Sequence, residues 1–227
     1  GQGRLGQFVF LMVMFILMIV GIIYVEQGQR RIPIQFAKRV RGRKVMGGQS
    51  TYIPLKVNSA GVIPVIFATS ILFFPALVAT SLPQDNNVTA AIRNWIDINL
   101  ANSQGTTWFY VFFLGILIIF FTYFYTTIQF DPVRQSDMIR RQGGFIPGVR
   151  PGISTTNYLS HIINRITLPG SVFLASVAVL PSIASVIWDI PLGFSGISIL
   201  ITVGVALETM KQIESQLSMR NYEGFID

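Results

Sequence analysis

Long apolar stretches alternate with polar segments along this chain, and the alternation predicts its secondary structure. A helix of 18 residues is roughly 27 Å long, close to the ~30 Å hydrocarbon thickness of a bilayer. The pattern therefore predicts an all-α membrane protein with five transmembrane helices, at about residues 5–25, 58–82, 106–129, 166–188 and 192–210. Two loops on one side, 26–57 and 130–165, and a loop on the other, 83–105, connect them.

Prolines interrupt two of the expected spans. Pro64 and Pro75 lie in the second span, and each lacks a backbone N–H donor, so we expect this helix to bend. Pro169 and Pro181 are expected to break the fourth span in the same way.

Helix caps can be placed at three positions. Asp131 followed by Pro132 has the pattern of an N-cap and a first helical residue, and predicts a short helix through Gln142. Ser154 is expected to cap the helix after the Gly- and Pro-rich segment 143–152. Asn58 either caps the second span or has a role of its own, and its position alone favours neither.

The first loop carries the pattern of a β-hairpin. Ile32, Ile34 and Phe36 alternate with polar residues, residues 41–44 provide a turn, and residues 52–55 can pair back. The loop is thus expected to project as an ordered arm.

Charge orients the chain in the membrane. In 227 residues, 51% are hydrophobic and only 12% are charged, with a net charge of +7. Fifteen of the 17 Lys and Arg residues fall in the loops and tail of one side, which predicts that this side is cytoplasmic. The basic residues are gathered into loops between uncharged spans, a pattern typical of membrane proteins rather than of soluble nucleic-acid-binding domains.

Candidate catalytic chemistry is missing from the sequence. There is no cysteine and only one histidine, His161, so neither disulfides nor a histidine-based metal cluster can form. The spans carry no charge that would indicate a proton relay, and we expect no catalytic residues, no metal site and no cofactor. The G-x-G-x-x-G at residues 1–6 precedes a span without a preceding strand, so it does not indicate a dinucleotide site.

The number of spans suggests an incomplete set. Five spans with an outside amino terminus are expected for the second half of a protein built from two inverted repeats.

Several long motifs carry a family resemblance. They are RRIPIQFAKRVRGRKVMGGQSTYIPLKVNSAGVIPVIFATSILFFP, GGFIPGVRPG, RITLPGSVFL, GISILITVGVALETMKQIESQL and MRNYEGF. In this order they resemble the SecY family of bacterial protein-conducting channels. The resemblance covers essentially the whole chain, 1–227, and implies helices six to ten, one inverted half of a ten-helix channel. It further implies a multi-pass protein of the bacterial plasma (inner) membrane that passes unfolded polypeptides across and helices laterally into the bilayer.

The same resemblance implies roles for individual residues. Ile66, in VIPVIF, and Ile201, in SILIT, would belong to an apolar pore ring. The lateral gate would include Asn58, Ser70 and Phe74. Binding of the SecA motor or the ribosome would involve Arg30, Arg31, Lys38, Arg39, Arg41, Arg43, Lys44 and Arg150.

Partners follow from the resemblance as well. They would be the SecE and SecG subunits, SecA, the ribosome, signal peptides and unfolded preproteins, membrane lipids, and the missing N-terminal half. Two other interpretations stay open: one repeat of a secondary transporter, and a membrane-anchored protein that docks ribosomes. Charge reversal at Arg43, Lys44 and Arg150 separates them, because a transporter should be indifferent to it.

Overall fold

Seven helices and five strands make up the parts of the chain that the computed structural model describes, which are residues 2–36, 39–41, 44–46, 50–81, 87–100, 107–188 and 195–223. In order they are α1 (Gln2–Gln27), β1 (Gln29–Phe36), β2 (Arg39–Arg41), β3 (Lys44–Met46), β4 (Ser50–Lys56), α2 (Ile63–Ser81), α3 (Asn87–Asn99), α4 (Trp108–Gln129), α5 (Pro132–Arg141), β5 (Gly144–Phe145), α6 (Ile153–Trp188) and α7 (Gly196–Glu223).

Five helical segments in these ranges are long and apolar enough to cross a membrane. They are Phe8–Gln27, Ile63–Ser81, Trp108–Arg141, Ile153–Ser185 and Gly196–Met219. The five-span prediction is therefore confirmed. The last helix, α7, continues to Glu223, well beyond its apolar part.

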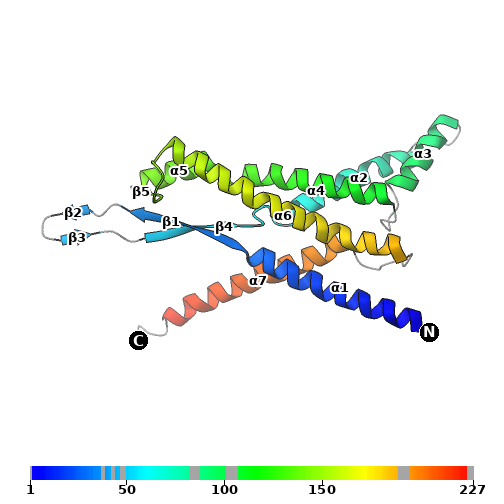
Figure 1. The fold of residues 1–227 in the computed structure, drawn as a ribbon, viewed down its shortest axis with the longest axis horizontal. Coiled ribbons are helices and arrows are strands. Elements are labelled where there is room, and N and C mark those ends of the chain that lie inside the picture. Colours follow the sequence, from blue (N-terminus) through cyan, green and yellow to red (C-terminus); the bar gives the residue numbers. More distant parts are fainter. Residues whose placement is uncertain are drawn as a thin grey trace.

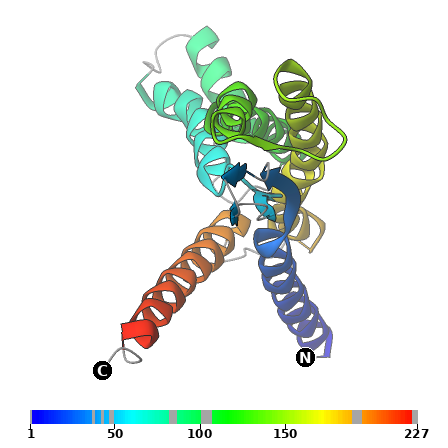
Figure 2. The same ribbon diagram turned by 90° about the vertical axis from the view of Figure 1, so that its left-hand side faces the viewer.

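The spans form a compact group and a divergent pair. Helices α2, α4 and α6 pack along one another, whereas α1 and α7 diverge into a V (Figures 1 and 2). The group and the pair share one buried cluster, which we call the membrane core. Its fully buried side chains include Ile22, Val65, Leu114, Ile118, Leu174 and Leu200.

A second buried cluster lies at the sheet end of the molecule (Figure 1). Strand β1 pairs antiparallel with β4, Ile32 opposite Ile53 and Ile34 opposite Thr51, so the predicted hairpin is confirmed. Strand β5, which the sequence did not indicate, pairs with the other edge of β1. We call the apolar cluster beneath this sheet the hairpin core; it consists of Ile32, Ile34, Leu55, Ile139, Ile146, Leu159 and Ile162.

The second span begins later than expected. Helix α2 starts at Ile63, and residues 57–62 form a non-helical turn in which Gly61 has a φ of 65°. A positive φ strains any residue with a Cβ, so glycine suits this turn. Pro64 consequently falls in the first turn, where a missing N–H costs nothing, and of the two prolines only Pro75 lies inside the helix.

The prediction that Pro169 and Pro181 break the fourth span was wrong. Helix α6 runs without interruption through both prolines. Tertiary packing explains this outcome, because Pro181 is buried and Leu174 between the prolines belongs to the membrane core. Neighbouring helices and hydroxyl side chains can satisfy the backbone near a proline within a membrane.

Of the two caps predicted in the loop 130–165, one is confirmed and one was wrong. The Asp131 carboxylate accepts hydrogen bonds from the N–H groups of Val133 (2.9 Å) and Arg134 (3.4 Å) at the start of α5. Ser154 does not cap α6, because the helix already begins at Ile153. Gly152, whose φ is 111°, makes the turn into the helix instead.

Candidate functional site

One face of α2 is left uncovered. Ile63, Ile66, Ser70 and Phe74 recur at intervals of three and four residues and are all exposed, while Val65, Ala68, Leu72 and Ala79 on the opposite face are buried. The Ser70 hydroxyl donates to the Ile66 carbonyl at 2.8 Å, so it is already satisfied within the helix. The uncovered face is therefore apolar in character. We call it the α2 stripe.

The predicted ring residues lie on two helices that approach each other. Ile66 is 45% exposed on α2 and Ile201 is 36% exposed on α7. The two helices come together at one end, where the turn just before α2 contacts α7: an added Cβ at Gly204 would lie 3.3 Å from Val62 Cγ2. They run in opposite directions (Figure 1), so Ile66, one turn after Val62, and Ile201, one turn before Gly204, occupy similar levels along the bundle.

A cavity of about 350 Å³ opens beside this contact. Both helices line it with residues one turn from the ring positions, Ile63 on α2 and Val205 on α7. Its polar lining includes Glu26, Lys56, Asn58, Gln129, Glu208 and Lys211. The cavity beside these two helices thus has both polar and apolar lining residues.

Asn58 joins two spans rather than capping one. Its side chain is only 5% exposed, and Nδ2 donates to Glu26 Oε2 at 2.9 Å, linking the turn before α2 to the end of α1. Asn58 lies in the turn before α2 and not in the helix itself, so the capping alternative was wrong, and its expected part in the lateral gate stays a prediction. Sequence reasoning missed Glu26, although an acidic residue closing an apolar span was a usable signal.

The predicted docking residues lie at the sheet end. Arg30 and Arg31 are exposed on β1, and the Arg31 guanidinium lies 4.9 Å from the centre of the Tyr52 ring. Arg150 is exposed in the turn before α6, and its carbonyl accepts from Thr155 Oγ1 at 3.0 Å. Arg39, Arg41 and Lys44 lie in the β2–β3 hairpin, whose register places Arg41 opposite Lys44, whereas Lys38 and Arg43 lie outside the described residues.

The two ends of the bundle differ in charge. Arg134, Arg140 and Arg141 of α5 add to the arginines of the sheet end. At the far end (Figure 1), α3 carries Arg93 and Asp97, which pair at 3.7 Å. In the ranges given above, no group of three His, Cys, Asp or Glu side chains could hold a metal ion.

These features define a multi-pass helical membrane protein with a basic, ordered end and uncovered apolar faces within its helix bundle. A family model described as SecY matches residues 2–210, and the chain belongs to the SecY family.

Named relatives agree with this assignment. The protein translocase subunit SecY of Streptomyces scabiei is 52% identical over 217 residues, covering 93% of this chain and 47% of the relative. The subunit of the same name from Thermus thermophilus is 47% identical over 227 residues, covering 100% of this chain and 50% of the relative. The chain spans about half the length of the curated relatives it matches.

Solved structures share the fold. One described as the structure of a protein conducting channel superimposes with a TM-score of 0.55 at 19% identity, over 88% of this chain and 47% of the other. Another, which concerns the plug domain of the SecY protein and the closed state of the channel, gives 0.54 at 19% identity, over 90% and 49%. The likeness shows that these five spans have the arrangement of about half of such a channel.

Proposed function

We propose that this chain forms the C-terminal half, helices six to ten, of a polypeptide-conducting channel in the bacterial plasma membrane. The observation that carries the proposal is the uncovered α2 stripe, with Ile66 at the level of Ile201 on the oppositely directed α7. An inverted N-terminal half would complete the enclosure. The half-length match to subunits named protein translocase supports this arrangement.

The proposed ring works by apolar contact alone. Isoleucine side chains offer no hydrogen bonds, so they do not select among the sequences of a passing chain. A narrow apolar gap also expels water and so resists ions when no polypeptide fills it. Ile66 and Ile201 would contribute this half's share of the constriction.

The proposed lateral gate lies along the rest of the α2 stripe. Ser70 and Phe74 follow Ile66 on the same exposed face. The turn at 57–62 and the Asn58–Glu26 hydrogen bond connect α2 to α1, so a tilt of α2 would be absorbed there. Signal peptides and membrane helices of unfolded preproteins would leave toward membrane lipids through this opening.

The basic end is the proposed docking face for the partners that supply energy. Arginines held by strand pairing and by the turn before α6 suit phosphate or carboxylate groups. We assign to this face Arg30, Arg31, Arg39, Arg41, Lys44 and Arg150, and we propose from the sequence alone that Lys38 and Arg43 take part in the same binding, with the SecA motor and the ribosome as the partners. The SecE and SecG subunits would complete the assembly. Within that assembly, this chain would be part of a non-enzymatic channel subunit.

Crosslinking to a stalled preprotein tests the ring. A photoreactive residue is placed at Ile66 or Ile201 in the complete channel, and at Ile71 as control. Ile71 is also 45% exposed on α2 but points about 140° away from Ile66 around the helix. We expect adducts with the stalled chain from Ile66 and Ile201 and few from Ile71. Equal adducts from all three positions, or none, would contradict the proposal.

A conductance measurement separates the other interpretations. Ile66→Ser, which makes the constriction wettable, should raise the ion leak of the resting channel, whereas Ile71→Ser should not. A substrate-dependent ion flux in the unaltered protein would instead favour a transporter repeat. Retained ribosome binding without any polypeptide passage would favour a docking protein.

A further inference from the structure

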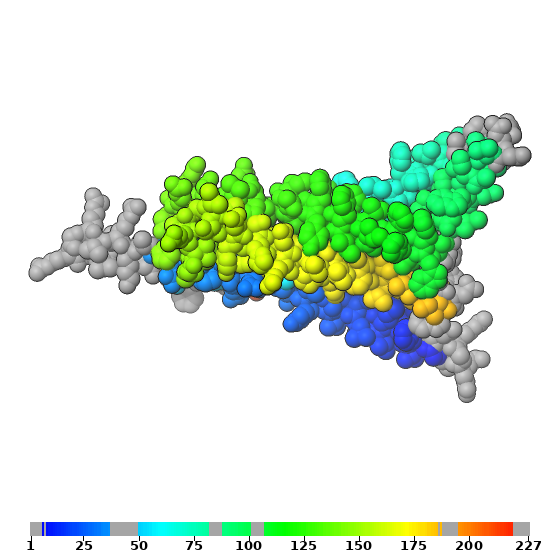
Figure 3. Space-filling view, turned by 45° about the horizontal axis from the view of Figure 1, so that its top comes forward, coloured from blue at the N-terminus to red at the C-terminus, as the bar shows by residue number. Residues whose placement is uncertain are grey.

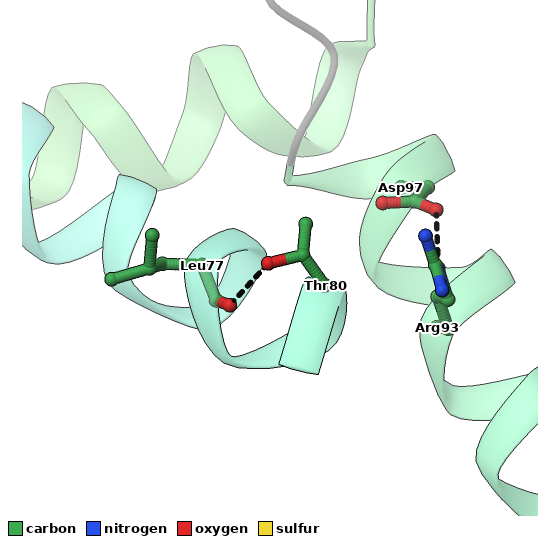
Figure 4. A network of polar contacts seen from close by, with 4 residues as sticks. All are labelled: Leu77, Thr80, Arg93 and Asp97. Atoms are coloured by element: carbon green, nitrogen blue, oxygen red, sulfur yellow. Dashed lines mark hydrogen bonds and ion pairs between the residues drawn. The ribbon is translucent and has the colours of Figure 1, made fainter. Parts of the chain in front are cut away.

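Helix α3, between the second and third spans, has two unlike faces. Val88, Ile92, Trp95 and Ile98 are exposed on one side, at spacings of three and four residues. Arg93 and Asp97 lie on the opposite side and pair with each other at 3.7 Å. Figure 4 shows this pair on the side of α3 toward the last turn of α2, where the Thr80 hydroxyl donates to the Leu77 carbonyl at 2.7 Å. The apolar face is consequently turned away from α2.

The position of α3 along the bundle is fixed by contacts with the third span. The Thr107 hydroxyl, just before α4, donates to the Ile98 carbonyl at 2.9 Å. The Trp95 ring lies 5.6 Å from that of Phe109 in the first turn of α4, with an interplanar angle of 72°. The C-terminal half of α3 is therefore held at the level where α4 enters the membrane, and α3 projects from that end of the bundle (Figure 3).

The apolar face of α3 continues into the lipid-facing surface of α4. The ring centres of Phe109 and Phe113 lie 4.7 Å apart, and those of Phe113 and Phe112 lie 6.4 Å apart. Phe112 begins an exposed row that continues through Ile116, Phe120, Phe124 and Ile128 down the length of α4. Since such a row on a membrane span faces acyl chains, the ring contacts extend one apolar surface from the span onto α3.

We propose that α3 lies in the outer membrane–water interface, with its apolar face in the lipid and Trp95 at the headgroup level. Tryptophan favours this level because its ring is apolar and its N–H is polar. An amphipathic helix with such a face binds in the plane of the interface. The Arg93–Asp97 pair is neutral overall, so the surface fits a zwitterionic bilayer and does not require anionic lipid. The helix anchors the outer ends of α2 and α4 against the bilayer.

Spin-label accessibility tests this proposal in the complete, membrane-reconstituted protein. Single cysteines replace Ile92, on the apolar face, and Asn94, an exposed residue about 160° away from Ile92 around the helix. Each carries a nitroxide in a cysteine-free background; this chain itself contains no cysteine. The vesicles contain phosphatidylcholine only. Collisions with oxygen, which concentrates in lipid, are compared with collisions with a water-soluble nickel chelate.

We expect an oxygen-to-nickel ratio several-fold higher at position 92 than at position 94. Equal, nickel-dominated collisions at both positions would place the face in water and overturn the proposal. Exclusion of both reagents at position 92 would show that protein covers the face, which would also overturn it.

A second measurement avoids labels. Trp95, kept as the single tryptophan of the protein, should be quenched by lipids brominated near the headgroup and little by aqueous iodide. The reverse order would overturn the proposal. Neither the spin-label collisions nor the tryptophan quenching depends on polypeptide passage through the channel. A result against the interfacial helix is therefore distinguishable from a result against the proposed pore ring.

Discussion

The membrane core and the hairpin core are held together by different residues, although both are apolar. The hairpin core consists of isoleucine and leucine side chains beneath a sheet whose exposed residues are mostly polar, Arg30, Arg31 and Lys56 among them. The membrane core includes small residues such as Ala68, Ala175 and Ala178, and its helices expose large apolar residues outward. In water, removing apolar surface from solvent drives packing, whereas in lipid close van der Waals contact between helices does so. The same apolar side chain therefore contributes a different free energy of packing in each region.

The largest effect is expected in the hairpin core. Leu159→Ala removes a fully buried side chain that joins α6 to the sheet, and should cost about 2–5 kcal/mol of the stability of this region. Hydrogen exchange of the β1 and β4 amides in the reconstituted protein measures the loss. Ile153→Ala, at an exposed position of the same helix, is the control, and an equal increase in exchange there would contradict the assignment of the hairpin core.

The second largest effect is expected where the backbone of the first loop lies against α6 at Gly170. A Cβ at Gly170 would lie 2.7 Å from the Val57 carbonyl oxygen, so Gly170→Ala forces a backbone shift that should cost about 1–3 kcal/mol. Gly115→Ala is a matched change, because its Cβ would lie 4.0 Å from Val179 Cγ2. We expect thermal unfolding in lipid discs at a lower temperature for the first variant only; an equally lowered midpoint for Gly115→Ala would argue against the steric explanation.

Two variants of α5 distinguish the contribution of the N-cap hydrogen bonds to stability from the contribution of surface charge. Asp131→Ala removes the acceptor for two backbone donors and should cost about 1 kcal/mol. Asp137→Ala removes the same charge from an exposed position of the same helix and should change the stability much less. Proteolysis of the α5 segment compares the two, and equal cleavage would show that charge, not capping, matters.

The smallest effect is expected at the lipid surface. Ile116→Ala, on the exposed row of α4, should change the free energy of unfolding in a bilayer by no more than about 0.5 kcal/mol, since lipid contacts the site either way. Ile118→Ala, two residues on and fully buried in the membrane core, should destabilise the protein clearly. Equal decreases in the thermal unfolding temperature of the two variants would mean that protein, not lipid, covers Ile116.

The sequence predicted features that depend on local pattern. Apolar length placed all five spans, alternation placed the β1–β4 hairpin, and Asp131 followed by Pro132 placed the cap of α5. Features that depend on contacts between distant segments were missed. Strand β5 is too short to show a pattern, and it exists because β1 offers an edge.

The candidate site residues likewise fall into those that a local pattern predicts and those that depend on a distant contact. Ser70 and Phe74 follow Ile66 at helical spacing, so their common face could be predicted. Asn58 could not be understood alone, because its partner Glu26 lies 32 residues earlier at the end of another span. Continuity of α6 through two prolines likewise depends on its buried neighbours, which no local signal reports.

The uninterrupted α6 has a mechanical consequence. Its 36 residues extend over roughly 54 Å, with Leu159 in the hairpin core and Leu174 in the membrane core. One continuous helix thus connects the two buried clusters. A force applied to the arginine-bearing sheet would be carried along this helix to the membrane core, and a hinge inserted between the two leucines should uncouple the two regions mechanically.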